Sequence, residues 1–428
     1  MRRGYTSLHM RHPVDSIDPI DRSTARSSRD ILLASVSRPL TDRAPADLVP
    51  AAKTEECASD VWLDVVNQAL AEGLGPLLSH QLDRAKAAMP AEIHETLRRR
   101  IAIEQIWSGL RAKATVDILH QLQASGIDAR AYKGQPLAQA LYGDATLKSS
   151  CDIDIIVSRS QISAAATQLD AMGYVSGVSL GWFKSATFLK SQKECAFSTM
   201  GGALCVDLHW GLVNRWNARP ALESELFELG PTVVVTGATL PWFNLPLLWR
   251  IQLGHLASSD WRGLKTFVDF VHLTDQLTDD ELSEALLRCH ELGASTAALA
   301  ALAVISELFG RAPRPVPAIV ERGYSKARAA AITKQCVARL RTPPLQTDHR
   351  VPTESAWARL GAHTSLSELM SSFSQLWTPA TVDFELATPA VSQPRLVFRM
   401  LARRAKKHLG LKWSGPTGSA TAADAIDR

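Results

Sequence analysis

The stretch CDIDIIV at residues 151–157 constrains this chain most, because it sets two carboxylates into a run of strand-forming apolar residues. Side chains alternate across a strand, so Asp152 and Asp154 share one face while Ile153 and Ile155 enter the core. Asp is depleted in strands, and two carboxylates ~5 Å apart repel by roughly 3 kcal/mol at an effective dielectric of ~20. A hard divalent ion such as Mg²⁺ offsets that repulsion, and the pair therefore predicts half of a metal site.

A second run, ALCVDLHW at residues 203–210, also alternates with period two and predicts a strand. Asp207 completes a three-carboxylate cluster for one or two ions if this strand pairs beside the first. His209 shares the face of Asp207 and is interpreted as a brace for that carboxylate, because magnesium prefers oxygen ligands. The alternative is that Asp152, Asp154 and Asp207 only solvate edge strands, since Asp-x-Asp is a common pattern.

A turn upstream of the Asp pair has the features of an anion site. Residues 127–132 predict a strand, the run KGQP at 133–136 follows, and a helix runs on to Gly143. Glycine allows close approach of a ligand, proline suits the first helical turn, and free amides at a helix start bind phosphate. Lys133 adds a positive charge at the same position.

Together these segments resemble the uncharacterised nucleotidyltransferase family of the DNA-polymerase-beta-like nucleotidyltransferase superfamily. The chain is similar to that family in its Lys-Gly turn, its Asp-Ile-Asp strand, the Gly-Tyr at 173–174 and the Asp-Leu-His-Trp strand at 207–210. The resemblance covers roughly residues 114–277. Two departures stand out: Lys133-Gly134 replaces the Gly-Ser of the superfamily, and Lys148 replaces an Arg, which removes the bidentate fork of that side chain.

The resemblance implies a magnesium-dependent nucleotidyltransferase that moves a nucleoside monophosphate from a nucleoside triphosphate to a small-molecule, sugar or peptide acceptor, with release of pyrophosphate. Two Mg²⁺ ions would be held by the same three catalytic carboxylates, Asp152, Asp154 and Asp207. Asp207 is also the candidate base. The phosphates would be met by Lys133, Gly134, Gln135 and Lys148. The alternative function is a catalytically degenerate protein that binds a nucleotide or a partner.

Three polar residues of the predicted C-terminal helices are second-tier candidates beside His209. His255 has the features of a satisfied helix-end histidine, and Lys265 with Asp269 has the four-residue spacing of a weak surface salt bridge. The resemblance favours them as groups that orient the base, the ribose or the acceptor.

Composition points to a cytoplasmic enzyme. A net charge of +4 and an isoelectric point near 8.7 are too mild for a dedicated nucleic-acid binder, so nucleic acid is not the expected partner. The six cysteines show no Cys-x-x-Cys spacing, which argues against a zinc ribbon or a disulfide framework. No apolar leader follows the first residues, and the apolar run at 297–305 is shorter than the ~20 residues that span a bilayer.

The expected fold class is α+β: a nucleotidyltransferase-type mixed sheet with flanking helices, plus N-terminal helices and a C-terminal helical domain. Residues 395–412 predict a basic amphipathic helix that docks on its own domain; contact of residues 395–409 with a membrane is the less favoured alternative. The expected division is a disordered arm at 1–57, N-terminal helices at 58–113, the nucleotidyltransferase α/β core at 114–240, a helical domain at 241–342, an irregular segment at 343–394, the basic helix at 395–412 and a disordered tail at 413–428.

Overall fold

The structure, a computed structural model, describes residues 22–37, 59–85, 89–212, 223–228, 230–259, 261 and 263–342. The predictions for residues 343–394, 395–412 and 413–428, and for most of the arm at 1–57, lie outside the described residues. In the described part no helix is both long enough and apolar enough to cross a membrane.

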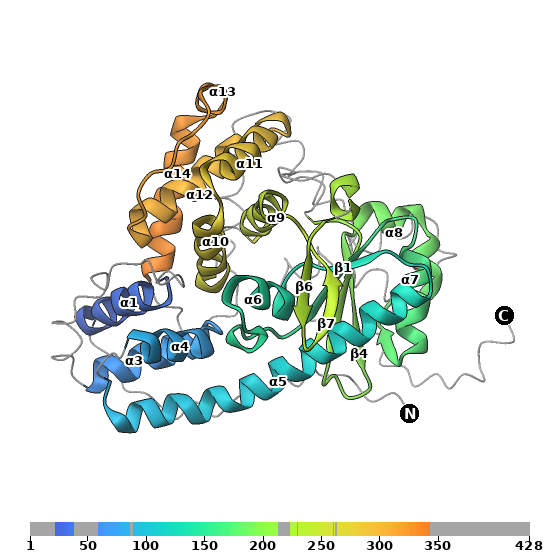
Figure 1. The fold of residues 1–428 in the computed structure, drawn as a ribbon, viewed down its shortest axis with the longest axis horizontal. Coiled ribbons are helices and arrows are strands. Elements are labelled where there is room, and N and C mark those ends of the chain that lie inside the picture. Colours follow the sequence, from blue (N-terminus) through green and yellow to red (C-terminus); the bar gives the residue numbers. More distant parts are fainter. Residues whose placement is uncertain are drawn as a thin grey trace, which may run out of the picture.

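A five-stranded mixed sheet lies at the centre of the α/β part of the protein (Figure 1). Its order is β1-β2-β5-β4-β3; β2 and β5 run parallel, and the other three neighbouring pairs are antiparallel. The α+β class with flanking helices is therefore confirmed. The strands are β1 (Ala129–Ala131), β2 (Ile153–Val157), β3 (Tyr174–Ser176), β4 (Glu194–Thr199) and β5 (Cys205–His209).

Helices cover the sheet, and β2 is buried at all five positions, as expected for a strand with structure on both faces. Helix α6 ends where Gly143 adopts a left-handed backbone with φ of 75°, the conformation that favours glycine. A separate hairpin packs against α6. These elements are α5 (Ala91–Ala124), α6 (Gly134–Tyr142), α7 (Ile162–Ala171) and α8 (Ala186–Ser191), with the hairpin strands β6 (Thr232–Val235) and β7 (Ala238–Pro241).

The C-terminal half of the described chain is helical. Asn244 caps the first of these helices by accepting a hydrogen bond from the Leu247 amide at 2.9 Å, and Thr278 with Glu281 forms a capping box at the third. Short 3-10 helices join other parts of the chain at Ala145–Leu147, Leu180–Lys184 and Glu223–Phe227. The helices are α9 (Leu245–Ser258), α10 (Leu264–Gln276), α11 (Asp279–Glu291), α12 (Ser295–Phe309), α13 (Ala318–Arg322) and α14 (Lys326–Arg341).

The N-terminal helices are α1 (Arg22–Val36), α3 (Ser59–Ala71) and α4 (Gly75–Ala85). Helix α1 corrects the prediction of a disordered arm, because it lies within residues 1–57 and buries Leu32 and Val36. The long helix α5 continues without a break through residues 113–114, where the sequence pattern places a domain boundary. The N-terminal helices and the sheet therefore share one continuous element.

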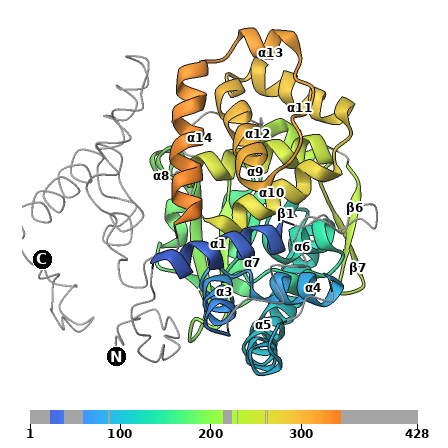
Figure 2. The same cartoon turned by 90° about the vertical axis from the view of Figure 1, so that its left-hand side faces the viewer.

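A buried arginine fixes α1 in place. Arg29 is 2% exposed; its Nη1 lies 2.6 Å from Glu72 Oε1, just after α3, and its Nε donates to the Leu340 carbonyl of α14 at 2.6 Å. Figure 2 shows α1 beside α3, with α14 rising from the same corner. The helix is polar in sequence, and these contacts add to the packing of its few apolar residues on α3 and α4.

Because removal of one partner leaves a buried charge uncompensated, Arg29→Ala should lower the free energy of unfolding by about 3–5 kcal/mol. Urea unfolding followed by circular dichroism measures this value. Asp30→Ala, at an exposed neighbouring position, is the matched control and should change stability by less than about 0.5 kcal/mol. Equal stability of both variants would contradict an anchoring role for Arg29.

Candidate active site

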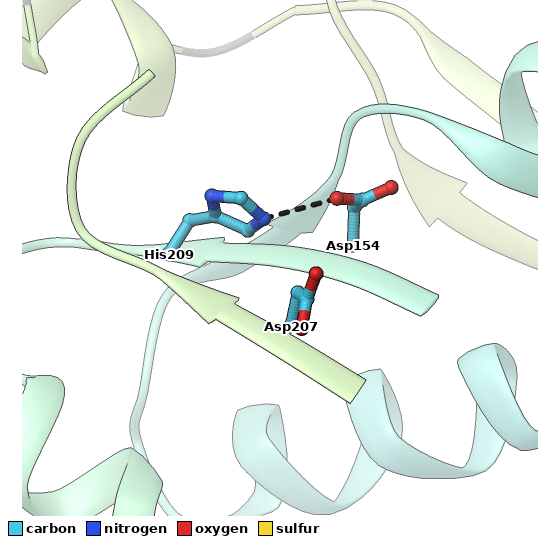
Figure 3. A group of neighbouring side chains, drawn as sticks. All are labelled: Asp154, Asp207 and His209. Atoms are coloured by element: carbon cyan, nitrogen blue, oxygen red, sulfur yellow. Dashed lines mark hydrogen bonds and ion pairs between the residues drawn. The ribbon is translucent and has the colours of Figure 1, made fainter. Parts of the chain in front are cut away.

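The parallel pairing of β2 with β5 brings two acidic residues side by side. Asp154 on β2 and Asp207 on β5 are direct register partners, and both rise from the same face of the sheet (Figure 3). Asp154 is 4% exposed, whereas Asp207 is partly exposed. The strand pairing on which the predicted carboxylate cluster depended is therefore present.

Asp154 is compensated by two neighbouring cationic groups. Its Oδ1 lies 2.8 Å from Lys133 Nζ and 3.0 Å from His209 Nε2. Burial alone would raise the pKa of the Asp154 carboxyl, but these two groups hold it well below its usual range. Asp154 is therefore ionised, and the Lys133 ammonium that the sequence assigned to phosphate faces this carboxylate.

His209 is held at both ring nitrogens. Nε2 faces Asp154, and Nδ1 lies 3.0 Å from Oε2 of Glu194 on β4. Ionised carboxylates only accept, so the ring donates from both nitrogens as an imidazolium. Burial would lower the pKa of His209, but the hydrogen bonds to Asp154 and Glu194 raise it. The predicted brace thus acts on Asp154 and not on Asp207, because His209 lies diagonally across the strand pair.

Sequence reasoning missed Glu194. Burial would raise the pKa of Glu194, but the hydrogen bonds and charges of His209 and Lys193 together lower it to about 2. The signal that could have found it is the register of the β4–β5 hairpin, in which Glu194 is the direct partner of His209.

Asp207 carries the least compensated charge of the cluster. Its pKa is raised to about 6, first by burial and then by the nearby charge of Asp152. One ligand atom each of Asp154, Asp207 and His209 lie within 4.8 Å of one another, a spacing that could hold a metal ion. Asp152 lies outside this group of three; its Oδ1 accepts a hydrogen bond from Ser150 at 2.9 Å.

The Lys-Gly turn lies directly against this cluster. Lys133 is the N-cap of α6, and Gly134 follows with a left-handed φ of 64° that strains any other residue. Gln135 is fully buried, and neither polar atom of its side chain has a partner among the described residues. Gln252 of α9 donates to the Tyr132 carbonyl at 3.2 Å, which fixes the turn to the helical half.

A family model described as an uncharacterised nucleotidyltransferase matches residues 58–310. The chain belongs to this nucleotidyltransferase family. The match extends beyond residues 114–277, where the resemblance was visible in the sequence, and takes in helices α3 to α12. No curated protein and no solved structure matches the chain.

Lys148 is paired with a carboxylate of the helical half of the chain. Its ammonium donates to Asp269 of α10, and both side chains are more than nine-tenths buried. The Tyr142 hydroxyl donates to the other oxygen of Asp269 at 2.6 Å. Lys265 donates instead to the Ser149 carbonyl at 2.7 Å. The predicted surface pair of Lys265 with Asp269 is therefore wrong, because each of these α10 side chains bonds the loop before β2 instead.

His255 lies on α9, near its C-terminal end. Burial, followed by the charge of Lys133, lowers the pKa of His255 to about 3, so the ring is neutral at physiological pH. A role of His255, Lys265 or Asp269 in orienting a substrate stays a prediction.

Asp207→Asn should stabilise the metal-free protein at pH 8, because the folded state raises the pKa of Asp207 from 3.8 to about 6 and so disfavours its charge. The expected gain is about 1–2 kcal/mol, since one pKa unit corresponds to about 1.4 kcal/mol and water screens this partly exposed group. The gain should disappear below about pH 4, where Asp207 is protonated in both states. Urea unfolding with a chelator present measures it; destabilisation at pH 8 would contradict the assigned electrostatics.

Asp269→Asn should cost about 3–5 kcal/mol of stability, because it leaves the Lys148 ammonium buried without a counter-charge. The double variant Lys148→Met/Asp269→Asn should recover most of that loss, since no unpaired charge remains. Denaturant unfolding of the two variants compares them directly. A double variant no more stable than Asp269→Asn would show that the loss comes from something other than the ion pair.

Proposed function

We propose that the protein is a magnesium-dependent nucleotidyltransferase that transfers a nucleoside monophosphate from a nucleoside triphosphate to a small-molecule, sugar or peptide acceptor. One observation carries the proposal: in a chain of this family, the parallel pairing of β2 with β5 makes Asp154 and Asp207 direct neighbours. Two carboxylates on one face of adjacent strands repel in the absence of a cation.

The donor set fits a hard divalent ion. Asp152, Asp154 and Asp207 offer carboxylate oxygens, the ligands that Mg²⁺ prefers. Asp154 Oδ1 already accepts from Lys133 and His209, so Oδ2 is its oxygen left for a metal. The raised pKa of Asp207 indicates negative charge that a cation would relieve. A bound Mg²⁺ would neutralise charge on the phosphates and lower the pKa of an attacking hydroxyl.

The chain's own residues account for the remaining chemistry. The amides of Gly134 and Gln135 at the start of α6 are oriented to bind phosphate oxygens. Asp207, the partly exposed carboxylate beside Asp154, is the candidate to take the proton of the acceptor hydroxyl. The acceptor oxygen bonds to the α-phosphorus, the bond from that phosphorus to the bridging oxygen breaks, and pyrophosphate leaves with the electron pair.

A second candidate, a catalytically degenerate nucleotide-binding protein, is favoured by a different observation. Lys133 and the His209 imidazolium compensate Asp154 without any metal, as a purely structural cluster also would. The intact Asp152 and Asp207 favour the transferase, because a binding protein does not need further like charges beside Asp154.

Calorimetric titration of the four nucleoside triphosphates with and without Mg²⁺ tests the proposal. We expect Mg²⁺-dependent binding that weakens about tenfold or more in Asp152→Asn and in Asp207→Asn, because each variant removes one carboxylate from the metal environment. Asp279→Asn, a surface aspartate at the start of α11, is the matched control and should bind as wild type.

The same titrated complexes, incubated with α-labelled triphosphate and a panel of sugar, small-molecule and peptide acceptors, separate the two candidates. A transferase releases pyrophosphate and labels an acceptor, whereas a degenerate binding protein holds the nucleotide unchanged. Failure of wild type to bind any triphosphate in either condition would overturn both.

A further inference from the structure

A chain of three side chains crosses three neighbouring strands of the sheet. Glu194 of β4 contacts His209 of β5, and His209 contacts Asp154 of β2; both contacts are 3.0 Å. The first contact follows from register, because Glu194 and His209 are direct partners in the antiparallel β4–β5 pair. The Glu194–His209–Asp154 chain is therefore set by backbone pairing.

The imidazole is the rigid middle of this chain. His209 is 1% exposed, and the Tyr132 ring packs edge-on against it with centroids 5.1 Å apart. With Nδ1 on Glu194, only one orientation of the ring points Nε2 at Asp154 Oδ1. Lys133 contacts the same oxygen, but its long flexible side chain fixes direction less well than an imidazole held at both nitrogens.

We propose that Glu194 is a positioning residue for the metal site. It holds the His209 ring, the ring holds Asp154 Oδ1, and the rotation of the Asp154 carboxylate is thereby fixed, with Oδ2 left for the metal. This inference rests on the proposed function, since it assigns Glu194 a role toward the divalent ion of that site. Groups that orient a metal ligand through a hydrogen bond are known to change metal affinity by about 10–100-fold.

Glu194 can be substituted without leaving a cavity in the hydrophobic core. Its side chain is 37% exposed at the outer end of the chain, whereas Asp154 at the inner end is 4% exposed. Two variants separate reach from charge. Glu194→Asp keeps the charge but is one methylene shorter, and Glu194→Gln keeps the length and an oxygen that accepts from Nδ1 but loses the charge.

The experiment is calorimetric titration of the full chain with Mn²⁺ alone at fixed pH, with thermal unfolding of each variant as the check on folding. Positioning predicts that Glu194→Asp binds Mn²⁺ about tenfold or more weakly than wild type, and that Glu194→Gln binds it more tightly than Glu194→Asp does. Glu291→Asp, at an exposed position on α11, is the matched control and should not change Mn²⁺ affinity.

The outcomes are distinct. If Glu194→Asp bound Mn²⁺ as wild type does and Glu194→Gln bound it more weakly, Glu194 would act only through its charge. That result would overturn the positioning role but leave the proposed function standing. Equal Mn²⁺ affinity of wild type and both variants would also overturn the positioning role and leave the proposed function standing. Absence of Mn²⁺ binding by folded wild type would overturn the positioning role together with the proposed metal-dependent function.

Discussion

The burial of one carboxylate, Asp154, is the constraint around which the rest of the site is arranged. An ionised carboxylate away from water costs several kcal/mol unless it is paired and hydrogen-bonded. Lys133 and His209 both contact its Oδ1, and they lie on different elements: Lys133 at the start of α6 and His209 on β5. The Lys-Gly turn, its left-handed glycine and the Gln252 contact that anchors it to α9 position Lys133. The β5 register positions His209.

The same arrangement joins the sheet to the helical half. Lys148, in the loop that enters β2, meets Asp269 of α10, and Tyr142 at the end of α6 bonds the same carboxylate. Lys265 holds the next residue of that loop, Ser149, by its carbonyl. The helical half thus holds the loop before the Asp pair through Lys148 and Ser149. Pairing within the sheet holds the strand β2 that follows this loop.

Much of the site was visible in the sequence because it depends on local periodicity. Two-residue alternation placed Asp154 and Asp207 on one face of their strands, and the Gly-containing turn marked the start of α6. The sequence did not show which side chains His209 and Lys148 contact. Which carboxylate His209 braces depends on a diagonal across two strands, and the partner of Lys148 lies 121 residues away. Helix α1 was missed for a similar reason, since the few apolar residues of its polar sequence are buried by other helices and Arg29 bonds distant partners.

That last contact bears on how the chain is made. Arg29 and the Leu340 carbonyl are separated by 311 positions, so the bond between them cannot form until α14 has left the ribosome. Contacts of such separation form late, because the cost of closing the loop precedes the gain. Helix α1 packs mainly on α3 and α4, which follow it closely in the sequence, so most of its docking surface is made soon after it. The bond to α14 is therefore a late closure, one that ties the already assembled N-terminal helices to the C-terminal end of the described chain.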